Sequence, residues 1–152
     1  MYKYNLRKEQ SGYSLFNLLV SIGVIVLLTT ISIPYLRKYQ PNLKLSATAR
    51  DLVSDLRYAQ QLTITEQIPH SVNFDINNGL YQIFKLDVAT TTIKTVEFDS
   101  NINFQDITGL SGHRVIFNYY GGVSQAGEIF LVNTNNVTAT VNIKPSGYIK
   151  LE

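Results

Sequence analysis

The chain has 152 residues, with 13 Lys or Arg against 11 Asp or Glu, which gives a formal net charge of +2. So small a charge gives no reason to expect a general attraction to nucleic acid. The chain has no Cys, which excludes disulfides, thiol nucleophiles and Cys-ligated metals. A chain of this length predicts one domain beyond any membrane segment.

An uncharged apolar run lies near the start of the chain. Residues 15–33 contain no Asp, Glu, Lys, Arg or His. About 19 helical residues span roughly 28 Å, close to the ~30 Å hydrocarbon core of a bilayer. The hydroxyls in the run can bond back to the helix backbone, so they are tolerable in lipid. The basic residues Lys3, Arg7 and Lys8 precede the run and favour a leader that stays in the cytoplasm.

Three interpretations of this run compete. A secretory signal peptide needs a small-residue cleavage site after its apolar core, and Ile33-Pro34-Tyr35-Leu36-Arg37 is a poor match. A plain membrane anchor fits the length. The third interpretation places cleavage before the run, at Gly12-Tyr13, and keeps the run in the mature protein.

The segment Ser11-Gly12-Tyr13-Ser14-Leu15-Phe16-Asn17 resembles the processing site of type IV prepilins and type II secretion pseudopilins. In that family a basic leader ends in glycine, and an N-methylated aromatic residue, usually Phe, begins a long apolar helix. The resemblance implies cleavage after Gly12 by a prepilin peptidase and methylation of the new amino group of Tyr13. Pro34 falls where many pilins carry a proline that loosens the helix.

Asn17 is the main departure, because the family has a glutamate at this position. The resemblance implies that the glutamate pairs with the amino terminus of a neighbouring subunit. A charged acid at the centre of a membrane helix costs about 3 kcal/mol, and a partner charge offsets it. Asn17 is neutral, so the chain inserts at lower cost and lacks the ion pair. We therefore expect a minor subunit near the tip of a filament, or one that initiates it.

A second helical pattern follows the apolar run. Apolar or small residues recur at alternating steps of four and three and form a stripe on one face of the helix: Leu45, Ala49, Leu52, Leu56, Ala59 and Thr63. Val53 and Leu62 widen this stripe. The pattern predicts one long helix from about Tyr13 to Gln67, interrupted by Pro34 and Pro41. The charged residues of the opposite side predict a solvated face: Arg50, Asp51, Asp55 and Arg57.

The chain from His70 onward reads as β-structure. Val72, Phe74 and Ile76 alternate with polar residues, and Asn77-Asn78-Gly79 predicts a hairpin turn into a strand over residues 80–86. Further strands are predicted at residues 93–98, 102–107, 114–119, 128–132, 137–143 and 148–151, separated by glycine-rich or asparagine-rich turns. A striped helix on such antiparallel sheets predicts an α+β domain.

This part of the chain is similar to the H-type minor pseudopilins and the related FimT-like minor pilins. The similarity rests on three sequence segments: Ala49–Ala59, Val72-Asn73-Phe74-Asp75 and the Pro145-Ser146-Gly147 turn near the end of the chain. It implies a pilin-like fold in which a long helix packs on antiparallel sheets. The expected organisation is a leader at 1–12, a transmembrane and filament-core helix at 13–41, and a globular domain at 42–152.

Little in the sequence supports catalysis or metal binding. His70 and His113 have no Cys or acidic pair at ligand spacing, so we expect no metal and no cofactor. The start of a calcium loop at Asp75-Ile76-Asn77-Asn78-Gly79 lacks the required bidentate Glu, which favours a hairpin turn. No nucleophile-elbow glycine pattern or phosphate-binding glycine loop is present. We read the chain as a non-enzyme.

DNA binding is the alternative function, because some FimT-like minor pilins bind DNA through a basic tail with a Gly-Arg-x-Arg pattern. Here Gly147-Tyr148-Ile149-Lys150 carries one base. The candidate phosphate contacts are Arg114, Lys144 and Lys150. Affinity scales with the number of bases, so these few support weak binding at most, and no nucleic-acid partner is expected.

The leading hypothesis is a minor pilin or pseudopilin with a structural role. It would cross the cytoplasmic membrane once, with its globular domain outside the cytoplasm, and then join a pilus or pseudopilus. Its expected partners are a prepilin peptidase and other pilins or pseudopilins, contacted through the N-terminal helix. An anchored β domain that never polymerises is a third hypothesis.

Overall fold

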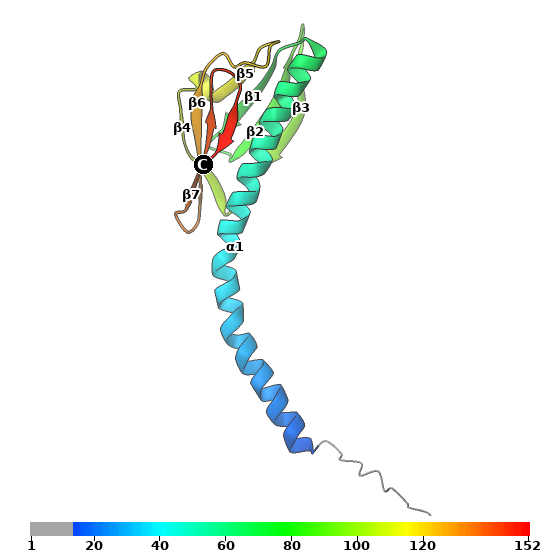
Figure 1. Ribbon diagram of the computed structural model, residues 1–152, viewed down its shortest axis with the longest axis vertical. Coiled ribbons are helices and arrows are strands. Elements are labelled where there is room, and N and C mark those ends of the chain that lie inside the picture. The colour runs from blue at the N-terminus through cyan, green and yellow to red at the C-terminus, as the bar shows by residue number, and fades with distance from the viewer. Residues whose placement is uncertain (1–13) are drawn as a thin grey trace, which may run out of the picture. The chain divides into compact units, whose positions relative to one another are not determined.

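The computed structural model describes residues 14–152, and one helix accounts for more than a third of them. Helix α1 spans Leu15–Glu66 without a break (Figure 1). The predicted interruption at Pro34 and Pro41 is therefore wrong, since helical structure continues through both residues. Each proline removes one donor from the helical hydrogen-bond ladder, and its neighbours keep the helical conformation. The described residues up to Lys38 and residues 39–152 belong to two separate compact units.

Eight strands follow α1, and they pair in the predicted antiparallel manner, in two sheets. The strands of the first sheet lie in the order β3-β2-β1-β5 and those of the second in the order β4-β6-β7-β8. Their bounds are β1 His70–Asp75, β2 Leu80–Leu86, β3 Thr90–Glu97, β4 Ile102–Thr108, β5 Arg114–Phe117, β6 Gly127–Asn133, β7 Thr138–Ile143 and β8 Ile149–Leu151, with a 3-10 turn η1 at Ser111–His113. The predicted α+β class is confirmed.

The β1–β2 hairpin forms where the sequence predicts it, with a turn that differs in detail. Asp75 pairs with Leu80, so four residues make the turn. Of the predicted turn residues only Gly79 has a positive φ, at 63°. The Asp75 carboxylate instead holds Asn78, accepting bonds from its backbone N–H at 3.1 Å and its side-chain amide at 2.7 Å. These bonds hold the pKa of Asp75 below its usual value.

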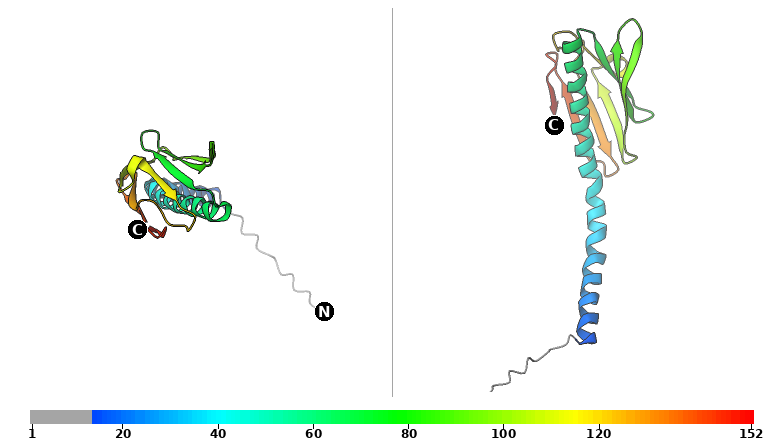
Figure 2. Two further views of the ribbon diagram at one scale, coloured as in Figure 1. Left: turned by 90° about the horizontal axis from the view of Figure 1, so that it is seen from above. Right: turned by 90° about the vertical axis from the view of Figure 1, so that its right-hand side faces the viewer.

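The core of the 39–152 unit lies between the second half of α1 and the two sheets (Figures 1 and 2). Every residue of the predicted helix stripe is buried: Leu45, Ala49, Leu52, Leu56, Ala59 and Thr63. The β part of the chain contributes a row of aromatic rings, in which Phe98, directly after β3, lies 4.7 Å from Phe104 and 5.8 Å from Tyr81 between ring centroids. Spacings of this kind are typical of favourable aromatic pairs.

Polar contacts tie the ends of the packed part of α1 to distant loops. Near its start, Lys44 bonds Asp99 at 2.6 Å, and Asn42 accepts a bond of 2.7 Å from Asn133. Near its end, the amide of Gln60 donates to the carbonyl oxygens of Gly121 at 2.5 Å and of Gly147 at 3.1 Å. These bonds fix where the β5–β6 and β7–β8 connections lie on the helix.

Candidate assembly helix and polar sites

The first part of α1 is an apolar surface. The large apolar side chains of residues 15–36 are exposed, including Leu15 at 80% and Ile31 at 67%. In the described part of the chain, α1 is the one helix long and apolar enough to cross a membrane, judged by length and composition. So much exposed apolar surface is unfavourable in water and needs a lipid or protein environment.

The hydroxyls of this part of α1 bond to its own backbone, as the sequence analysis expected. Ser21 Oγ donates to the carbonyl of Asn17 at 2.9 Å, and Ser32 Oγ donates to that of Leu28 at 2.9 Å. Thr29 and Thr30 donate to carbonyls one turn earlier, at 2.9 and 2.7 Å. Their polarity is therefore satisfied inside the helix.

Asn17 lies in the first turn of α1 and is exposed. Its backbone N–H donates to the carbonyl oxygen of Ser14 at 2.8 Å. Its side-chain amide thus projects from the start of the apolar helix, where the resembled family has its glutamate. Pro34 lies in the same helix, and its missing N–H leaves the carbonyl of Thr30 without the usual donor. The proposed processing residues Gly12 and Tyr13 lie outside the described residues.

The basic residues predicted as DNA contacts belong to different elements. Arg114 begins β5 in the first sheet, whereas Lys144 follows β7 and Lys150 lies in β8 of the second sheet. Lys150 is paired with Glu152 at 2.7 Å, which raises the pKa of Lys150 and offsets its charge. Lys144 Nζ lies 5.8 Å from the ring centroid of Tyr148. The three basic residues thus come from elements of both sheets, and Lys150 is already paired with an acid.

The predicted solvated face of the helix is wrong for Asp55, which is 8% exposed. Tyr81 donates its hydroxyl to Asp55 Oδ2 at 2.7 Å, and Lys94 of β3 bonds both carboxylate oxygens at 2.7 Å. Burial, and then the bond to Asp55, raises the pKa of Tyr81 far above its usual value. Arg50 and Asp51 are exposed as predicted, and Arg57, also exposed, donates to the carbonyl of Ile149 at 3.1 Å.

Replacing Asp55 by Ala is expected to lower the free energy of unfolding by about 2 kcal/mol, because the buried Tyr81 hydroxyl loses its acceptor. The full chain in detergent, unfolded with urea, measures this effect. Asp51→Ala is the matched control, since Asp51 is exposed on the same helix. The Asp55 change should cost less in a Tyr81→Phe background, which lacks the hydroxyl. Equal costs in the two backgrounds would contradict the role given to this bond.

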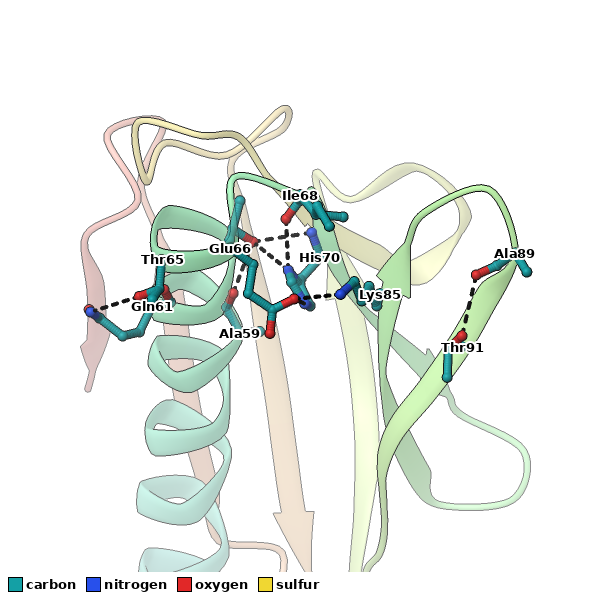
Figure 3. Close-up of polar contacts among 10 residues, drawn as sticks. Ala59, Gln61, Thr65, Glu66, Ile68, His70, Lys85, Ala89 and Thr91 are labelled. Atoms are coloured by element: carbon teal, nitrogen blue, oxygen red, sulfur yellow. Dashed lines mark hydrogen bonds and ion pairs between the residues drawn. The ribbon is translucent and has the colours of Figure 1, made fainter.

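His70 is the first residue of β1 and lies beside the end of α1 (Figure 3). Its side chain is completely buried. Its Nδ1 lies 2.8 Å from the carbonyl oxygen of Ile68, and because a carbonyl only accepts, Nδ1 donates there. Its backbone N–H donates to Thr63 Oγ1 at 3.1 Å, and Thr63 Oγ1 donates to the carbonyl of Ala59 at 2.9 Å. His70 thus belongs to a structural network in this part of the chain.

Glu66 and Lys85 extend this network to the surface. Lys85 Nζ lies 2.7 Å from Glu66 Oε2, and this bond holds the pKa of Glu66 below its usual value (Figure 3). His113, the other histidine, is exposed in η1 with a φ of 48°. Within residues 14–152, no group of three or more His, Cys, Asp or Glu side chains could hold a metal ion.

No protein-family model and no curated protein matches the sequence. The structure is similar to the minor pseudopilin EpsH from the Type 2 Secretion System of Vibrio cholerae, with a TM-score of 0.63 and 11% identity, over 72% of this chain and 96% of that one. It is also similar to the type IV minor pilin FimU of Pseudomonas aeruginosa, with a TM-score of 0.60 and 13% identity, over 75% of this chain and 92% of that one. The chain therefore has the fold of a minor pseudopilin or minor pilin, which confirms the fold that the sequence resemblance implied.

Proposed function

We propose that this chain is a minor pilin or pseudopilin, a structural subunit of a type IV pilus or a type II secretion pseudopilus. The observation that carries the proposal is one continuous helix, which is exposed and apolar in its first part and packed into a minor-pseudopilin fold in its second. The role assigned is structural, with no catalytic step.

The exposed part of α1 supplies the driving force for assembly. In the cytoplasmic membrane, lipid covers this surface, with the globular domain outside the cytoplasm. When the subunit leaves lipid, the helices of neighbouring pilins or pseudopilins cover the same surface. Burial of apolar area contributes about 25 cal/mol per Å², so an uncovered helix of this kind is strongly disfavoured in water.

Processing by a prepilin peptidase is the first test of this proposal. Coexpression with the peptidase is expected to yield a chain that begins at Tyr13 with a methylated amino group, as read by mass spectrometry of the intact protein. Replacing Gly12 by Val should leave the leader uncut. Gly23→Ala is the matched control, because a Cβ at Gly23 meets nothing within 4 Å. Cleavage near Pro34, or a wild-type leader that stays uncleaved, would contradict the proposal.

We propose that Asn17 determines how abundant the subunit is in the filament and where it lies: the chain would be a minor subunit near the tip or one that initiates assembly. A neutral residue cannot form the ion pair that the glutamate of the resembled family offers. Asn17→Glu is therefore expected to change how many copies enter a filament, or where they lie, as counted by quantitative immunoblotting and immunogold labelling of sheared filaments. Unchanged copy number and position would show that Asn17 has no such role.

A further inference from the structure

A groove between α1 and the last strand has no assigned role. Its volume is about 250 Å³, and it is lined by Arg50, Val53, Ser54 and Arg57 of α1 and by Leu151 of β8. The four helix residues are spaced by three, one and three positions, which places them on one face. Val53 is buried and Leu151 is half-buried, whereas the other three side chains are exposed. The groove therefore has an apolar floor and a polar, basic rim.

The positive charge of this groove is uncompensated. Within the described residues no ion pair involves Arg50 or Arg57. Arg57 gives one N–H to the carbonyl of Ile149 and retains further donors. Asp55 of the same stretch of helix faces away from the groove, since it bonds to Tyr81 and Lys94. Two arginines that line one groove and take part in no ion pair favour an anionic occupant, because a guanidinium binds a carboxylate with two parallel hydrogen bonds.

The backbone of β8 adds a second binding feature on the same side. Glu152 and Thr140 exchange backbone bonds of 3.1 and 2.8 Å, so Leu151, which pairs with Val141, occupies a non-hydrogen-bonded position. Its N–H and C=O point away from β7. Ile149, two residues earlier, has the same orientation, and Arg57 of α1 donates a hydrogen bond to its outward-facing carbonyl. The outer edge of β8 therefore faces the groove. Arg57 already occupies the Ile149 carbonyl, and the backbone groups of Leu151 can pair with another extended segment.

From this arrangement we infer that the groove, here called the Arg50–Arg57 groove, binds an extended acidic segment of a neighbouring pilin-like subunit. The segment adds to the outer edge of β8 through backbone bonds to Leu151. Its carboxylates pair with Arg50 and Arg57, and alternate apolar side chains lie on Val53 and Leu151. The inference rests on the assembly role proposed above and specifies the chemistry of one subunit contact.

Binding of a defined peptide tests this inference on the full chain in detergent. The probe is a fluorescein-labelled peptide of alternating Glu and Val, followed by fluorescence anisotropy. We expect binding that weakens about tenfold or more when both arginines are replaced, in the Arg50→Gln, Arg57→Gln double variant, since charge-assisted bonds are lost. A peptide with Gln in place of Glu should bind wild-type protein more weakly by a similar factor.

A second double variant, Arg114→Gln with Lys144→Gln, is the matched control, because it removes the same charge from exposed positions elsewhere. Its affinity should stay within about twofold of wild type. Equal losses in both double variants, tight binding of the Gln peptide, or no binding at all would overturn the inference. Displacement of the acidic peptide by single-stranded oligo(dT) that depends on Arg50 and Arg57 would overturn it in favour of nucleic acid. Cleavage after Gly12 is measured in a separate experiment. If the leader is cleaved but the peptide results contradict the inference, only the role of the groove is refuted and the proposed function stands.

Discussion

Replacing Gly147 by Ala is expected to lower the free energy of unfolding by on the order of 3 kcal/mol, the largest effect expected for a Gly→Ala change among the glycines of residues 14–152. Gly147 has a φ of 79°, which disfavours any side chain. An added Cβ would also overlap the carbonyl oxygen of Gly121 and press on Gln60 Nε2. Neither group can move freely, because Gln60 holds the carbonyls of both glycines.

Gly112→Ala separates the two causes of this cost. Gly112 also has a positive φ, of 67°, but a Cβ there meets nothing within 4 Å. Gly112→Ala should therefore lower the free energy of unfolding by about 1 kcal/mol, which is the cost of placing a side chain on a backbone with positive φ. Urea unfolding of the full chain in detergent, followed by near-ultraviolet circular dichroism of the tyrosines, gives both values. Equal destabilisation by the two changes would mean that the contact of the β7–β8 turn with Gly121 adds nothing.

Leu56→Ala is expected to cost about 3 kcal/mol, because it opens a cavity where α1 meets the sheets. Leu56 is completely buried in the middle of the packed stripe. The control is Leu43→Ala in the same helix, where the side chain is 69% exposed and the helix propensities of Leu and Ala are similar. That change should stay within about 0.5 kcal/mol of wild type. A similar cost at both positions would place the core elsewhere.

Local patterns predicted much of the fold. The stripe from Leu45 to Thr63 predicted which helix residues are buried, because helical spacing alone decides which side chains share a face. The strand from Leu80 to Leu86 was predicted with its observed bounds, since its flanking turn residues are local signals. The prolines misled the prediction, because proline removes a single donor and the neighbouring turns of α1 suffice to continue the helix.

The polar contacts could not be predicted in the same way, because they join residues far apart in the sequence. Asp55 looked solvated from its helix position, and its burial depends on Tyr81 and on Lys94, 39 residues away. The complete burial of His70 likewise depends on how the end of α1 meets β1. The sequence offered no sign of the Arg50–Arg57 groove either, since its floor includes Leu151 from the last strand. Charge spacing on a helix does not reveal what packs beside it.

The hydroxyl bonds within α1 have a consequence for transfer of the helix between environments. Ser21, Thr29, Thr30 and Ser32 satisfy themselves on carbonyls of their own helix, so they neither lose nor gain partners when lipid is exchanged for protein. The polar contribution to that exchange is close to zero, and the match of apolar side-chain shapes must then determine which helix packs beside it. In residues 15–33, Asn17 is the remaining polar side chain, and its amide can distinguish one neighbour from another by a hydrogen bond.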